Sequence, residues 1–143
     1  MIGLILTGHG DFSKGLISSL RMIAGEQSHI KAIVFDANED LENYKKNIRN
    51  QIEDFLEKYE GIIILTDIPG GTPFNISVIE SENTKNLEVI SGTNLPMLID
   101  VTLKSQFIDD VHELTDEILN TGKETIIKFQ LHEDKVDEIE GGI

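Results

Sequence analysis

The stretch GIIILTDIPGGTPFN (residues 61–75) contains the transition that decides the fold. It begins with a continuously apolar run, passes through Pro-Gly-Gly and continues into a segment that carries helix-start signals. A run that is apolar without alternation is typical of a strand buried on both faces of a parallel sheet. Thr72 is a good N-cap residue, and Pro73 suits the first helical position. The stretch therefore predicts a strand, a tight loop and a helix in immediate succession.

The same alternation of strand and helix recurs along the chain. Short apolar runs indicate strands at residues 2–6, 30–35, 61–66 and 87–91. Apolar residues spaced three or four apart indicate helices at residues 12–24, 41–59, 94–104 and 108–122, besides the helix that begins at Thr72. Gly25 and Gly122 stand where the helices before them would end. We expect a single-domain α/β fold, an open doubly wound sheet of four parallel strands in the order 2-1-3-4.

The final apolar segment, TIIKFQL (125–131), has a different character. Every second residue from Ile127 to Leu131 is apolar, and the residues between them are polar. This alternation suits an edge or antiparallel strand with one solvated face. Residues 132–143 hold five acidic side chains, one lysine and two glycines, and we expect a loose acidic tail. The predicted domain therefore covers residues 1–131.

The composition excludes several classes of protein. The 143 residues fit one domain, and 26 Asp and Glu against 12 Lys and Arg give a net charge of −14. Such a chain lacks the basic surface that binding to nucleic acid requires. The absence of cysteine excludes disulfides, thiolate chemistry and zinc–sulfur sites. The N-terminal apolar stretch is too short for a signal peptide, and no apolar run approaches the ~20 residues of a membrane span, so we expect a cytoplasmic protein.

His9 is the first candidate for chemistry. Ligands of open α/β sheets bind beyond the carboxyl ends of the strands. The loops at these ends are residues 7–11, 67–72 and 91–94. His9 follows the first strand between Gly8 and Gly10, in front of the helix that begins near Phe12. A helix N-terminus disfavours imidazolium and favours phosphate, and the glycines leave room for a close approach. The alternative is a histidine in a glycine turn that has no special task.

The second candidate is the loop after the third strand. Asp67 ends that strand, and the free amides of Gly71 and Thr72 can form a cradle for an anion, although Pro-Gly-Gly also suits an ordinary tight turn. In the 2-1-3-4 order Asp67 would lie beside His9. A carboxylate that accepts from Nδ1–H leaves Nε2 as the free nucleophile. A nucleophile, an orienting carboxylate and free amides are the parts that phosphoryl transfer needs.

The sequence holds fewer residues suited to other kinds of site, such as a metal site or a nucleotide-binding site. A metal site needs at least three ligands, whereas His9 and Asp67 supply two, and Asp11 is better suited to cap the first helix. No Walker A, G-x-G-x-x-G or G-x-S-x-G motif occurs, so we expect no metal and no cofactor. The other histidines are expected to be solvated surface residues: His29, His112 and His132.

Three motifs resemble one known family. They are TGHGDFSKGL (7–16), ILTDIPGGTPFN (64–75) and VISGTNLPML (89–98). In this order and at these spacings, the chain resembles the IIA component of the mannose-type (mannose, fructose and sorbose) sugar phosphotransferase system over roughly residues 1–130.

The resemblance implies a phosphotransferase. His9 would accept a phosphoryl group from phospho-HPr and pass it to a IIB protein, which phosphorylates a sugar during transport through a IIC/IID membrane pair. Asp67 would be bonded to the active histidine, and Gly71 and Thr72 would supply phosphate-binding amides. The resemblance also implies a homodimer in which the final strand is exchanged onto the partner's sheet. From their position we add Gly10 and Phe12 as contacts of a docking protein, with Phe12 equally suited to the core.

Two alternatives stay open at this point. One is the phosphotransfer subunit of the PTS-dependent dihydroxyacetone kinase, which typically lacks a segment such as GGTPFN. The other is a non-catalytic regulatory module that binds a partner according to its phosphorylation state. The sequence continues into no IIB domain, so we expect a separate IIB protein. The transported sugar cannot be read from the sequence, because a IIA component never touches it.

Overall fold

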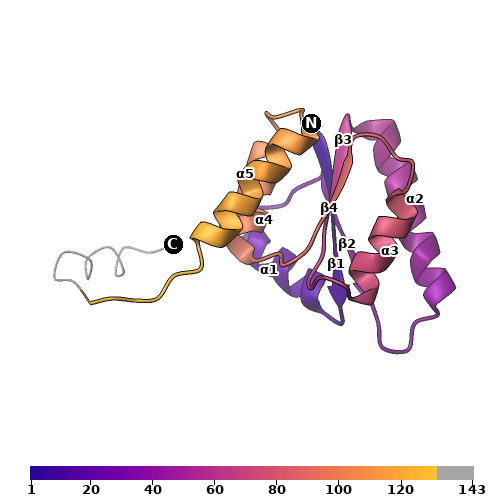
Figure 1. Cartoon of the computed structure of the whole chain (residues 1–143), viewed down its shortest axis with the longest axis horizontal. Helices are drawn as coiled ribbons and strands as arrows, with labels where there is room; N and C mark the ends of the chain where they lie inside the picture. Colours follow the sequence, from indigo (N-terminus) through magenta and orange to yellow (C-terminus); the bar gives the residue numbers. More distant parts are fainter. Residues whose placement is uncertain (132–143) are drawn as a thin grey trace.

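A four-stranded parallel sheet forms the centre of the computed structural model, which describes residues 1–131 (Figure 1). The strand order is β2-β1-β3-β4, and all neighbouring strands are parallel. The strands are β1 (Ile2–His9), β2 (Ile30–Phe35), β3 (Gly61–Leu65) and β4 (Leu87–Ile90). The predicted α/β class, the four parallel strands and the 2-1-3-4 order are therefore confirmed.

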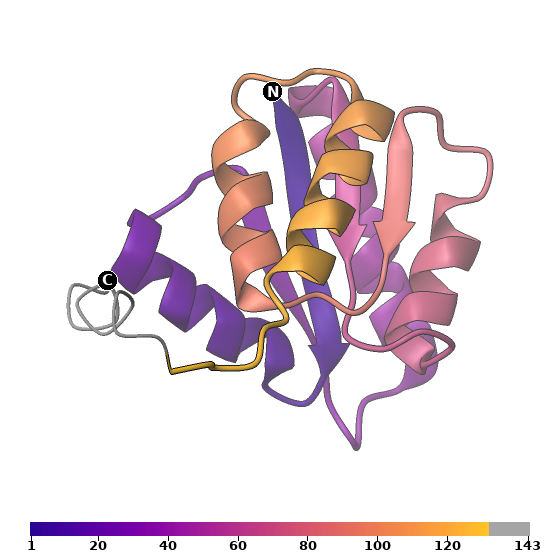
Figure 2. The ribbon, with the colours of Figure 1, turned by 60° about the vertical axis from the view of Figure 1, so that its left-hand side comes forward.

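Helices cover both faces of this sheet. They are α1 (Phe12–Ala24), α2 (Leu41–Lys58), α3 (Thr72–Ser81), α4 (Leu95–Lys104) and α5 (Val111–Glu124). The helices α1, α4 and α5 pack on one face, and α2 and α3 pack on the other (Figure 1; Figure 2). Successive strand residues point to opposite faces, so Leu4 joins the first cluster and Ile5 the second, both fully buried. Burial on both faces explains why β1 and β3 are apolar without alternation.

The predicted helix ends need two corrections. Thr72 is the first residue of α3 and not its N-cap; the N-cap is Gly71, without a side-chain capping bond. Gly122 does not end α5, which continues to Glu124. A Cβ at Gly122 would lie 2.4 Å from Sδ of Met97, so this glycine allows α4 and α5 to approach closely. Its role is packing between helices, for which the local sequence gives no separate signal.

The C-terminal segment forms no strand within the described chain. Residues 126–131 leave α5 as an extended arm, and Ile127 is 82% exposed (Figure 2). A strand needs a neighbour to satisfy its backbone groups, and none of the four strands of the same chain pairs with this segment. The single chain therefore forms no strand here, and the predicted C-terminal strand with its exchange between two chains stays a prediction. The predicted acidic tail, residues 132–143, lies outside the described residues.

His29 is buried, against the prediction of a surface residue. It is 2% exposed in the turn just before β2, and its Nε2 lies 3.1 Å from the carbonyl oxygen of Thr102 and 2.9 Å from Oγ of Ser105. Ser105 donates its own hydroxyl proton to the Thr102 carbonyl, so its oxygen accepts from Nε2–H. Burial lowers the pKa of His29, against a smaller opposite effect of the Thr102 hydrogen bond. The neutral imidazole thus ties β2 to the end of α4.

This buried histidine predicts a loss of stability in mild acid. The unfolded chain binds a proton at His29 at a higher pH than the folded chain, so the free energy of unfolding falls as the pH drops below the ordinary histidine range. In urea unfolding, the change in stability between about pH 7 and about pH 5 is expected to be larger for the wild type than for His29→Gln. Glutamine can still donate but cannot become charged. Equal pH dependence in the two proteins would contradict this prediction.

Candidate functional site

His9 and Asp67 meet at the carboxyl edge of the sheet. The strand β1 is longer than predicted, since residues 7–9 pair with residues 33–35 of β2, and His9 is its last residue. Asp67 follows the adjacent strand β3. One carboxylate oxygen, Oδ2, accepts from the backbone N–H of His9 at 2.9 Å and lies 2.6 Å from Nδ1 of the same residue. The predicted contact between these two side chains is therefore present.

The environment of Asp67 fixes which ring nitrogen carries the proton. Burial alone would raise the pKa of Asp67, because its side chain is only 11% exposed. Hydrogen bonds from the backbone and ring of His9 and from the backbone of Ile68 outweigh that effect and hold the pKa below its usual range. The ionised carboxylate can only accept, so Nδ1 of His9 donates.

The second ring nitrogen of His9 is left unpaired within the described residues. The side chain of His9 is 47% exposed, and within residues 1–131 no hydrogen bond reaches Nε2. A neutral imidazole with its proton held on Nδ1 presents the Nε2 lone pair outward. The geometry provides a nucleophile that a second molecule can reach.

The glycine loop lies against the same imidazole. A Cβ added to Gly71 would lie 3.0 Å from Cε1 of His9, so only a glycine leaves this gap unfilled. Asn75 holds the loop, donating from Nδ2 to the carbonyl of Gly70 at 3.0 Å and from its backbone to the carbonyl of Gly71 at 2.9 Å. The first N–H groups of α3, from Thr72 on, lack helical partners and therefore favour a nearby anion.

Gly10 and Phe12 flank His9 in different ways. Gly10 is exposed with a φ of +55°, a conformation that favours glycine, and its N–H donates to the carbonyl of Phe35 at 2.9 Å. Phe12 is half-buried against the core and packs over Gly8, which supports the core alternative for its side chain. Asp11 stands at the N-cap position of α1 but makes no capping bond, so the prediction of a capping side chain is wrong.

Phe35 is a neighbour of His9 that sequence reasoning missed. The two rings have centroids 5.8 Å apart and stand at 81° to each other. The predicted strand order places the end of the second strand beside the first, where His9 pairs with Phe35. The pairing of the first two strands could have indicated that Phe35 lies beside His9, but strand pairing does not give the orientation of the two rings.

The remaining histidines and acids build no metal site within the described chain. His112 is exposed, as predicted, and its Nδ1 pairs with the carboxylate of Glu88. His132 lies outside the described residues. Across residues 1–131, no group of three or more histidine and acidic side chains is placed to hold a metal ion. In the same range, no helix has both the length and the hydrophobicity to cross a membrane.

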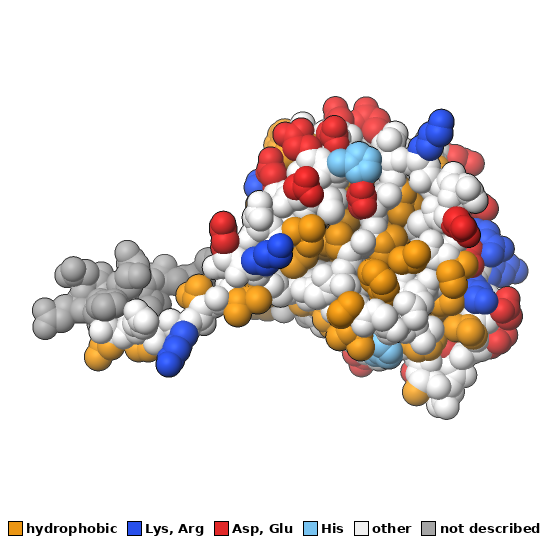
Figure 3. Space-filling model, viewed as in Figure 1, with side chains coloured by type: hydrophobic (Ala, Val, Ile, Leu, Met, Phe, Trp, Pro, Cys, Tyr) orange, Lys and Arg blue, Asp and Glu red, His pale blue; other side chains and the backbone are white. Residues whose placement is uncertain are grey.

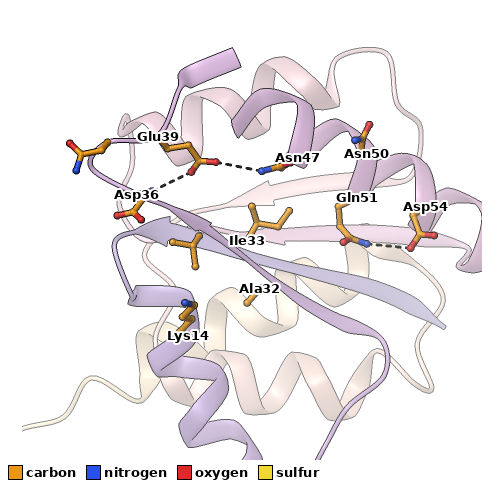
Figure 4. Close-up of a pocket in the computed structure, with 11 residues that line it drawn as sticks. Lys14, Ala32, Ile33, Asp36, Glu39, Asn47, Asn50, Gln51 and Asp54 are labelled. Atoms are coloured by element: carbon orange, nitrogen blue, oxygen red, sulfur yellow. Dashed lines mark hydrogen bonds between the residues drawn. The ribbon is translucent and has the colours of Figure 1, made fainter. Parts of the chain in front are cut away.

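A hollow of about 790 Å³ runs along β2 and α2 (Figure 4). Its lining combines apolar residues of β2 with the acidic side chains of Asp36, Glu39 and Asp54, and it includes neither His9 nor Asp67. The half-exposed side chain of His9 lies on the surface of the molecule, outside this hollow. An open nucleophile suits transfer to and from a docking macromolecule better than binding of an enclosed small molecule.

Comparison with known proteins gives consistent matches. The profile of the family described as "PTS system fructose IIA component" matches residues 3–121. The chain is 34% identical over 101 residues to the fructose-specific EIIA component of Bacillus subtilis, covering 71% of this chain and 68% of that protein. It is 28% identical over 125 residues to the mannose-specific EIIAB component of Escherichia coli, covering 87% of this chain but only 38% of that protein. The chain thus spans less than half of the EIIAB length.

Solved structures agree with the sequence matches. A phosphotransferase system component EIIA from Streptococcus agalactiae superposes with a TM-score of 0.79 at 34% identity, over 90% of this chain and 98% of that chain. A mannose/sorbose-specific IIA subunit from Enterococcus faecalis gives a TM-score of 0.76 at 25% identity, over 92% of this chain and 96% of that chain.

Proposed function

The chain belongs to the IIA family of mannose-type sugar phosphotransferase systems, and from this we propose that His9 carries a phosphoryl group from phospho-HPr to a IIB protein. The observation that carries the proposal is the Nδ1–Asp67 contact at 2.6 Å on a half-exposed side chain, because this contact leaves Nε2 available as the nucleophile. The acceptor would be a IIB protein, and the transfer would take place in the cytoplasm. Contact with a membrane IIC/IID pair would be indirect, through IIB.

The transfer step follows from this geometry. The Nε2 lone pair of His9 attacks phosphorus in line, a P–N bond to His9 forms, and the bond from phosphorus to the donor breaks with its electron pair leaving on the donor. The imidazole gains positive charge as this bond forms. Asp67 stabilises that charge while it holds the Nδ1 proton, and the first N–H groups of α3 near Thr72 offset the charge of the phosphoryl oxygens. Transfer to IIB is the same step in reverse.

Labelling tests this function. With labelled phosphoenolpyruvate, enzyme I and HPr, the chain is expected to acquire one phosphoryl group, and an added cognate IIB protein is expected to remove it. His9→Ala should abolish labelling, whereas the matched control His112→Ala, at an exposed histidine, should not change it. Labelling without discharge would favour a regulatory module. Absent labelling, or labelling that survives His9→Ala, contradicts both functions.

We also propose a homodimer in which the 125–131 segment of each chain joins the partner's sheet. The arm is supported by its exposure and by its alternation of apolar and polar residues. The receiving edge would be β4, because apolar side chains extend across the face where β4 lies, between α3 and α5 (Figure 3). Val78 and Ile79 are exposed on α3, a helix that packs against β4. An added antiparallel strand would cover them and satisfy the free groups of β4.

A further inference from the structure

The imidazole of His9 has little to hold it besides Asp67. Its ring makes one hydrogen bond, from Nδ1, and almost half of the side chain is exposed. A ring held at one atom can still rotate about χ2, and a half-turn exchanges the positions of Nδ1 and Cδ2. That rotation would break the bond to Asp67 and turn Nε2 away from its outward direction. Productive transfer therefore requires a second restraint on the ring.

Phe35 is placed to supply this restraint. It is the last residue of β2, paired in register with His9, and its ring meets the imidazole edge to face at 5.8 Å. Its backbone is fixed as well, because its carbonyl accepts from Gly10 at 2.9 Å. Gly71 approaches the ring at Cε1. The imidazole thus lies among three fixed neighbours: the Asp67 carboxylate, the Gly71 backbone and the Phe35 ring.

The position of Phe35 is in turn fixed by Tyr44 of α2. The two rings lie 4.8 Å apart at 56°, and Tyr44 is fully buried. Its hydroxyl lies 2.6 Å from Oγ1 of Thr7, which donates its own proton to the carbonyl of Ile33 at 2.7 Å. Since Thr7 has only that proton, Tyr44 is the donor. Burial raises the pKa of Tyr44 to about 12, so the hydroxyl stays protonated at neutral pH.

We propose that Phe35, supported by Tyr44, is a positioning residue for His9: it restrains the imidazole so that Nδ1 stays on Asp67 and Nε2 points outward. This inference rests on the proposed phosphoryl transfer at His9 and adds a residue that acts through the orientation of the imidazole. It gives Phe35 a role distinct from the core packing of other partly buried aromatic residues.

The chain offers a matched control. Tyr59 packs against the same apolar cluster as Phe35 and makes a perpendicular ring pair with Phe55, with centroids 5.0 Å apart. It lies beyond the other end of α2, away from His9. Replacing Phe35 or Tyr59 by leucine therefore removes a similar aromatic contact from the same cluster, but only the first replacement frees the imidazole.

Two readouts test the proposal. In ¹⁵N NMR of the unphosphorylated chain, His9 is expected to hold its proton on Nδ1 in the wild type and in Tyr59→Leu, and to show a mixture of tautomers in Phe35→Leu. At saturating phospho-HPr, Phe35→Leu should slow the phosphorylation of His9 at least about tenfold, with little change in the donor concentration needed for half-saturation. Phe35→Tyr, which keeps the ring, should restore both readouts.

The outcomes separate the two proposals. An unchanged tautomer and an unchanged rate in Phe35→Leu, or an equal loss in Tyr59→Leu, would overturn the positioning role. A wild-type chain that phospho-HPr does not phosphorylate would overturn the proposed function, whereas the tautomer measurement would still decide whether Phe35 restrains the ring.

Discussion

Asp67→Asn is expected to slow the phosphorylation of His9 about a thousandfold while leaving the fold intact. Asparagine matches aspartate in size, so the packing around Gly8 and the end of β3 is kept. It carries no charge to stabilise the imidazolium that forms as Nε2 bonds to phosphorus. Its amide group can also donate to Nδ1, which favours the tautomer with the proton on Nε2 and removes the nucleophile.

The measurement is a single-turnover reaction with phospho-HPr, together with a urea unfolding curve for each protein. Glu88→Gln is the matched control, because within residues 1–131 it neutralises a second carboxylate that contacts a histidine ring, that of His112. We expect the wild-type rate for Glu88→Gln. Wild-type kinetics for Asp67→Asn would remove Asp67 from the mechanism, and a loss of folding would show that its role is structural.

Two negative charges introduced by substitution into the 125–131 segment are expected to dissociate the proposed dimer. Phe129 and Leu131 lie on the apolar side of the predicted strand, which would face the partner's helices in the exchanged arrangement. Phe129→Asp combined with Leu131→Asp would bury two carboxylates there, and the dimer should weaken at least about a hundredfold. Sedimentation should then show the 16.0 kDa chain, whereas the wild type should show twice that mass.

Lys128→Ala is the matched control for the arm, because Lys128 occupies the polar side of the same predicted strand. It should leave the dimer unchanged. A wild-type chain that sediments as a monomer, or a doubly charged variant that stays dimeric, would rule out the exchanged strand as the interface.

The features predicted well were those that follow from local pattern combined with topology. The apolar runs of β1 and β3 indicated buried parallel strands, and the 2-1-3-4 order then placed Asp67 beside His9. No side-chain detail was needed, because the carboxyl ends of adjacent parallel strands meet at one edge of a sheet.

The features predicted wrongly or missed depend on partners far away in the sequence. His29 is buried because Thr102 and Ser105, 73 and 76 residues further on, satisfy its ring. Gly122 resembles a helix end locally, but its role is set by Met97 across the helix pair. Phe35 lies between the rings of His9 and Tyr44, and the spacing of apolar residues along the sequence does not reveal these contacts.

Phosphorus NMR of the chain after incubation with phosphoenolpyruvate, enzyme I and HPr locates the transferred group directly. The geometry at His9 and Asp67 predicts one phosphohistidine resonance, of the Nε2-linked form, that is absent from His9→Ala. A phosphoryl group on Nδ1 would contradict the orientation by Asp67. A phosphoryl group on any other residue, or none at all, would contradict the assignment of His9 as the carrier.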